Sequence, residues 1–577
     1  MEKTGAQILI ESLLKEKVEV VFGMPGGPAL FLFDEMYKSN LNFILARHEQ
    51  AAVHMADGYA RATGKTGVGI FTSGPGATNT VTGLATAYMD SVPLVVITGQ
   101  VVTTVIGQDG FQEVDTTGIT RPITKHNFLV KDVKTLARTI KEAFYIASTG
   151  KPGPVLIDFP GDIQRAKCDY VYPDKVEIRS YKPTIEGHIG QIKKAAQIIN
   201  ASKNPVLYIG AGVVISKAEK EVLAISQKAQ IPVTHTLLAV GAYPYNDELS
   251  LNMLGMHGTF WANKAIQSAD VIIAVGARFD DRCTGKVVDF ARNADIVHID
   301  IDPASISKIF KTDIPVVGDA KAILKKMETF IEKKERKDWI AKINQWKKEN
   351  PLRYDENDDK LHPQYVISKL SELTKGEAIV TTEVGQHQMW AAQYYKAKHS
   401  RLFLTSGGLG TMGFGFPAAI GAKSVNPDKE VIAIAGDGSF QMNMQEMAVC
   451  MANDMPVKVI ILNNQFLGMV RQWQMMFYDK HYAHSCLAKR KECPPKCNTP
   501  NNGKCPAYLP DFVLWAQSYG AEGIRVKSKK EVELALKKML ASKNSVVLDV
   551  WIEKEENVFP MVPAGNALDE MLFRFHG

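Results

Sequence analysis

The sequence predicts an α/β protein made of three doubly wound, parallel-sheet domains. Two observations support this fold class. Short apolar runs rich in Val and Ile alternate with amphipathic stretches along the chain of 577 residues, a pattern typical of parallel sheets covered by helices. A Tyr/Pro/Lys stretch at 169–183 and a highly charged stretch at 332–360 then interrupt this alternation. We therefore expect domains at 1–165, 188–335 and 362–553, followed by a C-terminal tail at 554–577.

Each domain contains strand candidates. They are Val68–Phe71, Leu94–Thr98 and Val155–Phe159 in the first domain, Val206–Gly210, Val233–Thr236, Val271–Val275 and Ile296–Ile299 in the second, and Val431–Ala435 and Val457–Leu462 in the third. The pattern also predicts one amphipathic helix over Met442–Asn453, between the last two strands, and a solvated helix with a connector within 332–360.

Composition excludes several classes of function. The 68 basic and 62 acidic residues give a net charge of only +6, and no dense basic stripe points to nucleic acid. No apolar run is long enough to span a bilayer, and the first residues lack the layout of a signal or transit segment. We expect a cytoplasmic protein that binds neither nucleic acid nor membrane.

Polar residues follow the two strands predicted in the third domain. Gly436-Asp437-Gly438-Ser439 comes after the first strand and Asn463-Asn464 after the second, with 27 positions from Asp437 to Asn464. In a right-handed βαβ unit both strands end at the same sheet edge, where α/β proteins bind ligands. The glycines leave backbone amides open to an anion, and the oxygen ligands suit Mg²⁺. A simple turn remains the alternative for either segment alone.

The paired segments resemble the signature of thiamine diphosphate enzymes. The resemblance implies that Asp437, Asn464 and the carbonyl of Phe466 hold the metal that binds the cofactor's diphosphate, with Gly468 close by.

An acidic residue begins a helical pattern in the first domain. Glu49 shares one face with Ala52, Val53, Ala56 and Ala60, so we expect its carboxylate to be partly buried, which raises the pKa and suits a proton shuttle. A helix cap or a pair with Arg47 is the alternative from the pattern alone. The same resemblance implies that Glu49 binds N1′ of the cofactor's pyrimidine ring, and that one site is shared between two subunits.

Further strings along the whole chain narrow the resemblance. They are Val21–Gly27, Thr72–Asn79, Ile106–Glu113, Val384–Trp390, Thr405–Gly415, Gly468–Gln474 and Pro560–Gly565. Together and in this order they resemble the large catalytic subunits of biosynthetic acetolactate synthases, also called acetohydroxyacid synthases. These enzymes decarboxylate pyruvate and join the hydroxyethyl carbanion to a second pyruvate or to 2-ketobutyrate, in the first common step of branched-chain amino-acid synthesis. The resemblance implies a homodimer or tetramer and a small regulatory subunit.

The resemblance also implies roles for individual residues. Catalytic roles fall to Glu49, Gln112, Met469 and Trp473, and the substrate pocket to Phe111, Gln112 and Trp473. Trp473 is expected to favour 2-ketobutyrate as second substrate, since an indole can bury its extra methylene. Thiamine diphosphate contacts are implied for Pro25, Gly26, Val384, Gly385, Gln386, His387, Gly410, Met412, Gly436, Gly438 and Ser439.

The middle domain carries strings that resemble the FAD-binding stretches of the biosynthetic type, although FAD does no net redox work in that family. Arg278 and Arg282 are expected at the pyrophosphate and Asp300 at the adenosine ribose. The other residues implied are Gly210, Gly212, Leu254, Gly255, Met256, His257, Gly276, Asp280 and Asp319. A surface charge cluster is the alternative.

Two departures from the family stand out. Gly161 occupies a position where the family usually has Lys near the substrate. An insertion of about twenty residues also follows the Trp473 loop, and it holds Cys486, Cys493, Cys497 and Cys505 with 6, 3 and 7 residues between them. These thiols would suit Zn²⁺ or an iron–sulfur cluster, redox disulfides, or simply an irregular loop.

Three other functions were weighed. Glyoxylate carboligases resemble this chain but lack the acid at Glu49, and Trp473 also argues against that activity. In a pyruvate oxidase, pyruvate would reduce the flavin. An inactive scaffold would not be expected to keep Glu49, Asp437, Asn464, Met412 and Gln112.

Overall fold

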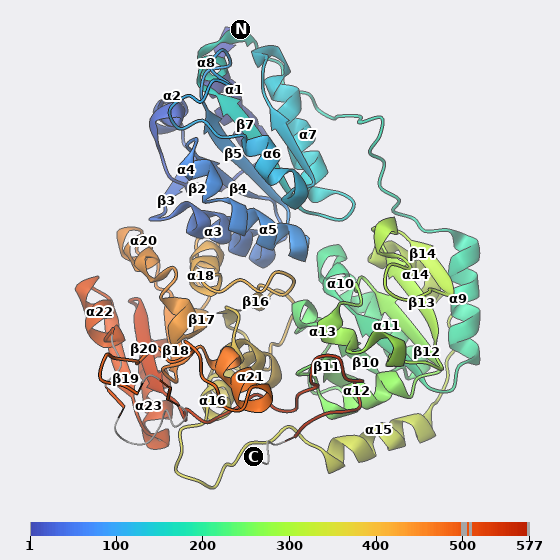
Figure 1. The fold of residues 1–577 in the computed structure, drawn as a ribbon. Coiled ribbons are helices and arrows are strands. Elements are labelled where there is room, and N and C mark those ends of the chain that lie inside the picture. Colours follow the sequence, from blue (N-terminus) through green and yellow to red (C-terminus); the bar gives the residue numbers. More distant parts are fainter. Residues whose placement is uncertain (1, 495, 498–504, 507–509, 574–577) are drawn as a thin grey trace.

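The fold consists of three α/β domains, as expected from the sequence. The computed structural model describes residues 2–494, 496–497, 505–506 and 510–573. The described residues form three six-stranded sheets and one two-stranded sheet. Every strand pairing in the three large sheets is parallel. In Figure 1 the first domain lies at the top, the third at the lower left and the middle domain at the lower right.

The first domain has the strand order β3-β2-β4-β5-β7-β6. Its central strands are buried because helices cover both faces. A small antiparallel pair, β1 with β8, ties the N-terminus to the end of the domain. The bounds are β1 Glu2–Thr4, α1 Gly5–Lys15, β2 Val20–Gly23, α2 Leu30–Tyr37, β3 Asn42–Leu45, α3 Glu49–Thr63, β4 Gly67–Phe71, α4 Pro75–Thr78, α5 Val81–Asp90, β5 Leu94–Gln100, α6 Thr116–Thr120, β6 His126–Leu129, α7 Leu136–Ser148, β7 Pro154–Pro160, α8 Gly161–Arg165 and β8 Lys167–Asp169.

The middle domain has the order β11-β10-β9-β12-β13-β14 and follows an irregular connector. The charged stretch forms one helix, α15, and a connector, as predicted. The bounds are α9 Ile189–Ala201, β9 Pro205–Ile209, α10 Ala211–Ser216, α11 Glu219–Ala229, β10 Val233–His235, β11 Ser250–Met253, α12 Phe260–Gln267, β12 Val271–Val275, α13 Asp281–Thr284, β13 Asp295–Asp300, β14 Ile314–Val317, α14 Ala320–Glu328 and α15 Lys337–Glu349.

The third domain has the order β16-β15-β17-β18-β20-β19, which places the two strands singled out in the sequence side by side. The bounds are α16 Pro363–Thr374, β15 Ile379–Thr382, α17 Gln386–Tyr394, β16 Phe403–Thr405, α18 Gly415–Lys423, β17 Val431–Gly436, α19 Asp437–Phe440, η7 Met444–Glu446, α20 Met447–Ala452, β18 Lys458–Asn463, α21 Gly468–Phe477, α22 Phe512–Ser518, β19 Glu522–Val526, α23 Lys529–Ala541 and β20 Val546–Trp551.

The single helix expected over 442–453 was wrong. The segment forms η7 followed by α20. The first of these starts only at Met444, because Asn443 leaves helical geometry and its side chain donates to the Gly413 carbonyl at 2.8 Å. All nine predicted strands are present to within two residues at either end.

Helices α3 and α18 join the first and third domains, and Figure 1 shows them facing each other. Glycines allow the helices to approach closely. A Cβ at Gly58 would lie 2.1 Å from the Ala418 carbonyl oxygen, and one at Gly421 would lie 1.8 Å from that of Met55. Backbone contact of this kind fixes the two domains relative to each other. Among the described residues, no helix has the length and apolar character needed to cross a membrane.

Candidate active site

Asp437 and Asn464 meet at the carboxyl edge of the third sheet, as the sequence predicted. Each directly follows one of the paired strands β17 and β18. The Asp437 carboxylate accepts hydrogen bonds from the backbone N–H groups of Asn464 and Gln465. Its Oδ2 has no protein partner although the side chain is buried, and burial raises the pKa of Asp437 to about 8. A buried carboxylate oxygen without a partner fits a cation site, because a bound cation would supply the missing charge.

Two glycines at this edge let the backbone lie close to the side chains of Gln386 and His387. A Cβ at Gly468 would lie 2.2 Å from Gln386 Oε1, and one at Gly436 would lie 3.0 Å from His387 Nδ1. His387 is buried, its Nε2 has no protein partner, and burial lowers its pKa to about 3. The ring is therefore neutral and leaves one nitrogen for a ligand. Val384, Gly385, Gln386 and His387, all predicted contacts, lie together here at the start of α17.

Glu383 supports this edge from beneath, and the sequence reasoning missed it. The Ser439 hydroxyl and the backbone N–H groups of Gly413 and Phe416 act on its buried carboxyl group and lower its pKa, but burial outweighs them. Burial raises its pKa to about 7. Glu383 thus links the turn after β17 to the segment that follows Met412.

A cavity of about 980 Å³ lies between the middle and third domains and is also lined by first-domain residues, among them Asp90 and Lys151. Predicted residues from both domains line it: Gly210, Gly212, Leu254, Met256, His257, Gly276, Arg278, Asp280, Arg282, Asp300, Asp319, Val384, Gly385, Gly410, Met469 and Trp473. Gly255 adjoins it, with φ of 111° and no room for a side chain, because a Cβ would lie 2.3 Å from the Arg282 carbonyl oxygen. The volume is large enough for an extended cofactor.

Glycines shape the floor of this cavity. A Cβ at Gly210 would lie 2.2 Å from the Gly276 carbonyl oxygen, and one at Gly212 would lie 2.6 Å from the Gly276 Cα. The strand ends β9 and β12 can therefore approach each other and leave backbone exposed to a ligand. Asp300 ends the neighbouring strand β13, and burial raises its pKa to about 6. Cationic Arg278 and Arg282 suit a pyrophosphate, so the residues present fit FAD.

Asp280 and Asp319 also have structural roles. Asp280 caps α13 by accepting from the backbone N–H groups of Arg282 and Cys283 at 3.0 and 3.2 Å. Asp319 caps α14 by accepting from Ala322 at 2.9 Å. In each of the two residues, one carboxylate oxygen therefore already accepts hydrogen bonds from the backbone of the protein.

Helix α21 carries Met469 and Trp473 four positions apart, so both face the cavity. Both side chains are half-buried. The Trp473 ring also packs on Phe477, with centroids 5.4 Å apart. Phe466, which precedes this helix, is buried, and its backbone N–H donates to Asn464 Oδ1 at 3.0 Å.

Glu49 begins α3 and is buried, as the helical pattern predicted. Its Oε2 accepts from Asn79 Nδ2 at 2.9 Å, and its Oε1 faces Gly76. The cap is His48, whose Nδ1 accepts from the Gln50 N–H at 3.1 Å, so neither the capping role nor a pair with Arg47 explains Glu49.

The remaining predicted residues of the first domain lie on loops of that domain. Gly26, which follows Pro25, lies against the Thr72 side chain, which also contacts Gly76. Gln112 has a left-handed φ of 61° and packs on Gly74, while Phe111 is 90% exposed. Among the predicted first-domain residues, Pro25, Gly26, Glu49, Phe111 and Gln112 do not line the 980 Å³ cavity. Met412, two residues after Gly410, is half-buried. It also does not line the cavity.

Cys486 is attached directly to the predicted metal loop. It forms an antiparallel bridge with Phe466, and the flanking N–H groups of Leu467 and Leu487 donate to Ser485 and Gln465 at 2.8 and 2.9 Å. Arg490 N–H donates to Cys493 Sγ at 3.3 Å. Over the described parts of the chain, no three His, Cys, Asp or Glu side chains are arranged to hold a metal ion. A metal at the four cysteines therefore remains a prediction.

Comparison with known proteins identifies the family. Three family models described as the N-terminal TPP binding, central and C-terminal TPP binding domains of thiamine pyrophosphate enzymes match residues 3–119, 192–327 and 383–550. The chain is 45% identical to the acetolactate synthase isozyme 3 large subunit of Escherichia coli over 98% of both chains. The chain belongs to the acetolactate synthase large-subunit family.

Other members of the family have similar sequence identity to this chain. The Haemophilus influenzae acetolactate synthase large subunit is 45% identical over 99% of this chain and 98% of its own. The probable large subunit of Methanocaldococcus jannaschii is 46% identical over 98% of this chain and 95% of its own. Bacterial and archaeal relatives are thus similar to this chain along all three of its α/β domains. The chain is a thiamine pyrophosphate-dependent enzyme.

Several residues of the site were not predicted from the sequence. Asn79 ends the Thr72–Asn79 string, but its contact with Glu49 joins residues 30 positions apart. Glu383 and Asp90 carry no local pattern that distinguishes them from surface acids. The Asp57 and Arg61 pair, spaced by four positions on α3, was the available signal for the ion cluster described below.

Proposed function

We propose that the protein is the catalytic subunit of a biosynthetic acetolactate synthase. It would join the two-carbon unit from pyruvate to a second pyruvate or to 2-ketobutyrate, giving 2-acetolactate or 2-aceto-2-hydroxybutyrate for branched-chain amino-acid synthesis. The observation that carries the proposal is the buried, partnerless Asp437 Oδ2 beside Asn464 at the sheet edge, within a chain similar to acetolactate synthases along its whole length.

The third domain would hold the cofactor's diphosphate. Asp437, Asn464 and the Phe466 carbonyl would bind Mg²⁺, while Gln386 and His387 would meet phosphate oxygens. When bound, thiamine diphosphate supplies the electron sink that decarboxylation of a 2-ketoacid requires. The chain's own residues would orient it: the Gly410 carbonyl would accept from the 4′-amino group, and Met412 would pack against the cofactor.

Glu49 would hold a proton at N1′ of the pyrimidine ring. Its burial and its single hydrogen bond from Asn79 leave one carboxyl oxygen free for that contact. A carboxyl group shielded from water keeps a defined hydrogen bond to a ring nitrogen, which is what proton transfer at this position needs. Met469 and Trp473 would exclude water from the reacting carbon and shape the pocket for the second ketoacid.

We infer that two chains are needed for each site. Glu49, Phe111 and Gln112 lie on the first domain outside the cavity that Gly410, Met469 and Trp473 line. Phe111 is exposed in the single chain, as expected for a residue that a second copy would cover. The active form would be a homodimer or tetramer, and a small regulatory subunit would join it, as the large-subunit names of the relatives suggest.

The middle domain would bind FAD in the glycine-floored cavity, with Arg278 and Arg282 at the pyrophosphate. We infer that the four cysteines would bind Zn²⁺ or an iron–sulfur cluster. Metal analysis of the purified protein decides this: one equivalent of zinc, or iron with sulfide, lost in a variant with all four cysteines replaced by Ser, would support it. No bound metal would refute it.

One experiment tests the activity. Purified protein is incubated without oxygen with thiamine diphosphate, Mg²⁺, FAD and pyruvate, and acetolactate and the flavin spectrum are followed together. Acetolactate with the flavin still oxidised supports the synthase, and the Glu49→Gln variant should form very little. Bleached flavin without acetolactate would mean that pyruvate reduces the flavin, as in a pyruvate oxidase.

A further inference from the structure

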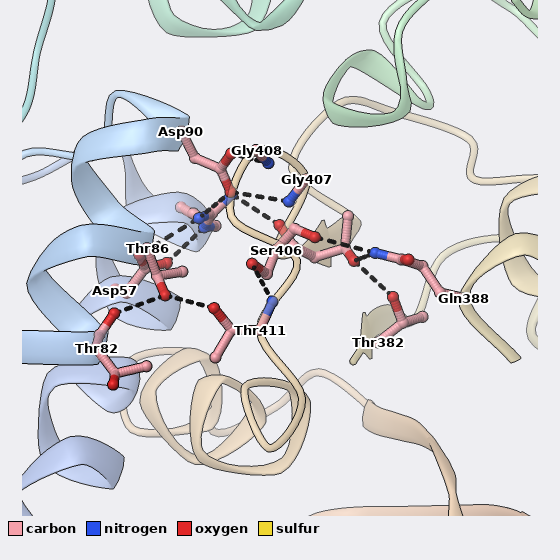
Figure 2. Close-up of polar contacts among 12 residues, drawn as sticks. Asp57, Thr82, Thr86, Asp90, Thr382, Gln388, Ser406, Gly407, Gly408 and Thr411 are labelled. Carbon is pink, nitrogen blue, oxygen red and sulfur yellow. Dashed lines mark hydrogen bonds and ion pairs between the residues drawn. The ribbon is translucent and has the colours of Figure 1, made fainter. Parts of the chain in front are cut away.

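The Thr405–Thr411 loop lies where the three domains meet. It follows β16 and carries Gly410, whose φ is 76°. Figure 2 shows side chains of α3 and α5 reaching it from the first domain and Thr382 and Gln388 reaching it from the third. Gln388 Nε2 donates to Thr405 Oγ1 at 2.7 Å and to the Ser406 carbonyl at 3.0 Å. The start of the loop is therefore fixed by its own domain.

Asp90 holds the middle of this loop from the first domain. It is the last residue of α5 and is buried. Its Oδ2 accepts from the Gly407 N–H at 3.0 Å and its Oδ1 from the Gly408 N–H at 2.6 Å (Figure 2). A carboxylate that accepts two consecutive backbone N–H groups fixes the direction of that backbone.

Arg61 neutralises and orients Asp90. Its Nη2 donates to Asp90 Oδ2 at 2.8 Å, its Nε to Asp57 Oδ1 at 2.5 Å and its Nη1 to the Thr405 carbonyl at 2.9 Å. Burial opposes the charge of Arg61, but the two carboxylates outweigh it and raise its pKa, so the guanidinium stays charged. Asp57 and Asp90 both pair with Arg61, but only Asp90 accepts from the loop amides. Substitutions of the two acids can therefore be compared directly.

Thr86 holds the far end of the loop. Its hydroxyl lies 2.7 Å from that of Thr411 and donates to the Thr82 carbonyl at 2.8 Å, so Thr411 is the donor between the two. The Thr411 N–H donates to Ser406 Oγ at 3.0 Å, which closes the loop on itself. Gly410 is thus held from both sides by contacts that it does not make itself.

The middle domain touches the same loop. A Cβ at Gly408 would lie 2.9 Å from Asp90 Oδ1 and 3.1 Å from Arg278 Nη2. Asp90, Arg278 and Gly408 all line the cavity assigned above to FAD. An occupant that draws on Arg278 therefore acts on the backbone that Asp90 holds, two residues before Gly410.

We propose that Asp90 is a positioning residue that holds the Thr405–Thr411 loop for thiamine diphosphate, and that this loop couples the flavin cavity to the thiamine site. The proposal rests on the proposed cofactors. It assigns Asp90 no contact with substrate or cofactor. Its effect passes through the Gly407 and Gly408 amides to the Gly410 carbonyl.

The test measures binding of thiamine diphosphate to full-length apoprotein with Mg²⁺, by quenching of tryptophan fluorescence, with and without FAD. In the wild type, FAD should lower the Kd for thiamine diphosphate severalfold. Asp90→Asn should raise that Kd about tenfold, since hydrogen bonds to a charged group are lost, and should remove most of the FAD effect. Activity at saturating thiamine diphosphate should fall much less than affinity.

Two controls separate positioning from general packing. Asp57→Asn removes the other carboxylate of Arg61 and should lower thermal stability while leaving the Kd within about twofold. Thr86→Val should weaken thiamine diphosphate binding, whereas Thr82→Val, whose side chain is exposed on the same helix, should not. If Asp90→Asn does not fold, the comparison of Thr86→Val with Thr82→Val still tests the proposal.

Specific outcomes would overturn the proposal. They are an unchanged Kd in both Asp90→Asn and Thr86→Val, an equal loss in Asp57→Asn, or no effect of FAD on the wild type. A wild type that binds thiamine diphosphate but forms no acetolactate would instead refute the proposed function and leave this inference standing.

Discussion

The backbone N–H of Arg47 donates to both carboxylate oxygens of Glu446, at 3.2 and 3.0 Å. Glu446 lies in η7 of the third domain and is fully buried, whereas Arg47 precedes Glu49 by two residues in the first domain. The contact therefore anchors the start of α3, and with it Glu49, the proposed catalytic acid, to the domain that carries the predicted metal loop.

The burial of Glu446 predicts a pH dependence of stability. Burial raises the pKa of Glu446 to about 7 from its ordinary value of 4.5. The folded protein then holds this proton more tightly than the unfolded chain, so the contribution to stability is full below about pH 4.5 and is lost as pH rises to about 7. At 1.36 kcal/mol per pKa unit the loss is on the order of 3 kcal/mol.

Replacing Glu446 by Gln should remove this dependence. Thermal unfolding measured from pH 5 to 7.5 should show a smaller decline of Tm in Glu446→Gln than in the wild type. Asp34→Asn, at an exposed pair with Lys38, is the matched control and should keep the wild-type slope. Parallel pH profiles for wild type and Glu446→Gln would contradict the assignment.

Sharing of each site between two chains predicts complementation. Glu49→Gln and Asp437→Asn should each be nearly inactive alone, but a mixed dimer would contain one site with both wild-type residues. With random pairing, half of the dimers are mixed and half of their sites are intact, so activity should return to about a quarter of wild type. Co-expression of the two variants with different tags provides the measurement.

The double variant Glu49→Gln with Asp437→Asn is the control. Paired with wild type, it leaves no intact site in the mixed dimers if the residues act across chains. Complete failure of the two single variants to complement, while mixed dimers are recovered, would place both residues of a site in one chain.

Sequence periodicity predicted the strands and the burial of Glu49, because both follow from local patterns of apolar residues. It also placed Asp437 beside Asn464, since adjacent parallel strands end at one edge of a sheet. It could not predict that Asp90 binds the Gly407 and Gly408 amides, 317 and 318 positions away. Such contacts depend on how the domains pack against each other, and a local pattern of apolar residues carries no information about that packing.

The helix over 442–453 shows a related limit. Its apolar positions fit a helix, yet Asn443 bonds to Gly413, a partner 30 positions away that the pattern does not contain. The resemblance to known enzymes supplied the roles of Met412, Met469 and Trp473, which physical reasoning from the residues alone would have assigned to an ordinary core.

Gly161 predicts weak binding of the anionic substrate. It starts α8 at the end of β7, and a Cβ there would meet nothing closer than the Gln100 carbonyl oxygen at 3.8 Å. Gly161→Lys should therefore fold and restore a cation, lowering the KM for pyruvate about fivefold at low salt, as expected for about 1 kcal/mol of attraction. The effect should shrink as salt is added.

Gly161→Met is the matched control, since it has similar length without the charge. It should leave the KM near the wild-type value. Equal effects of Lys and Met would show that side-chain volume, not charge, matters at this position.

The bridge between Cys486 and Phe466 predicts that thiol oxidation disturbs the metal loop. Treatment with a thiol oxidant should lower the activity of the wild type, and a thiol reductant should restore it. A variant with Cys486, Cys493, Cys497 and Cys505 all replaced by Ser should keep its activity under the same treatment. Cys168→Ser, far along the chain in β8, is the control and should respond as the wild type does. An equal response of the fourfold variant would refute this role.

Trp473 predicts the choice of second substrate. It lines the cavity one helical turn from Met469, so it can bury the methylene group by which 2-ketobutyrate exceeds pyruvate. Burying one methylene is worth about 0.8 kcal/mol, or about fourfold in rate. Trp473→Leu should therefore lower the ratio of 2-aceto-2-hydroxybutyrate to 2-acetolactate about fourfold when both ketoacids compete. Phe477→Leu, which is 42% exposed and outside the cavity lining, should leave the ratio unchanged. If both variants shift the ratio equally, the helix as a whole rather than the indole sets the preference.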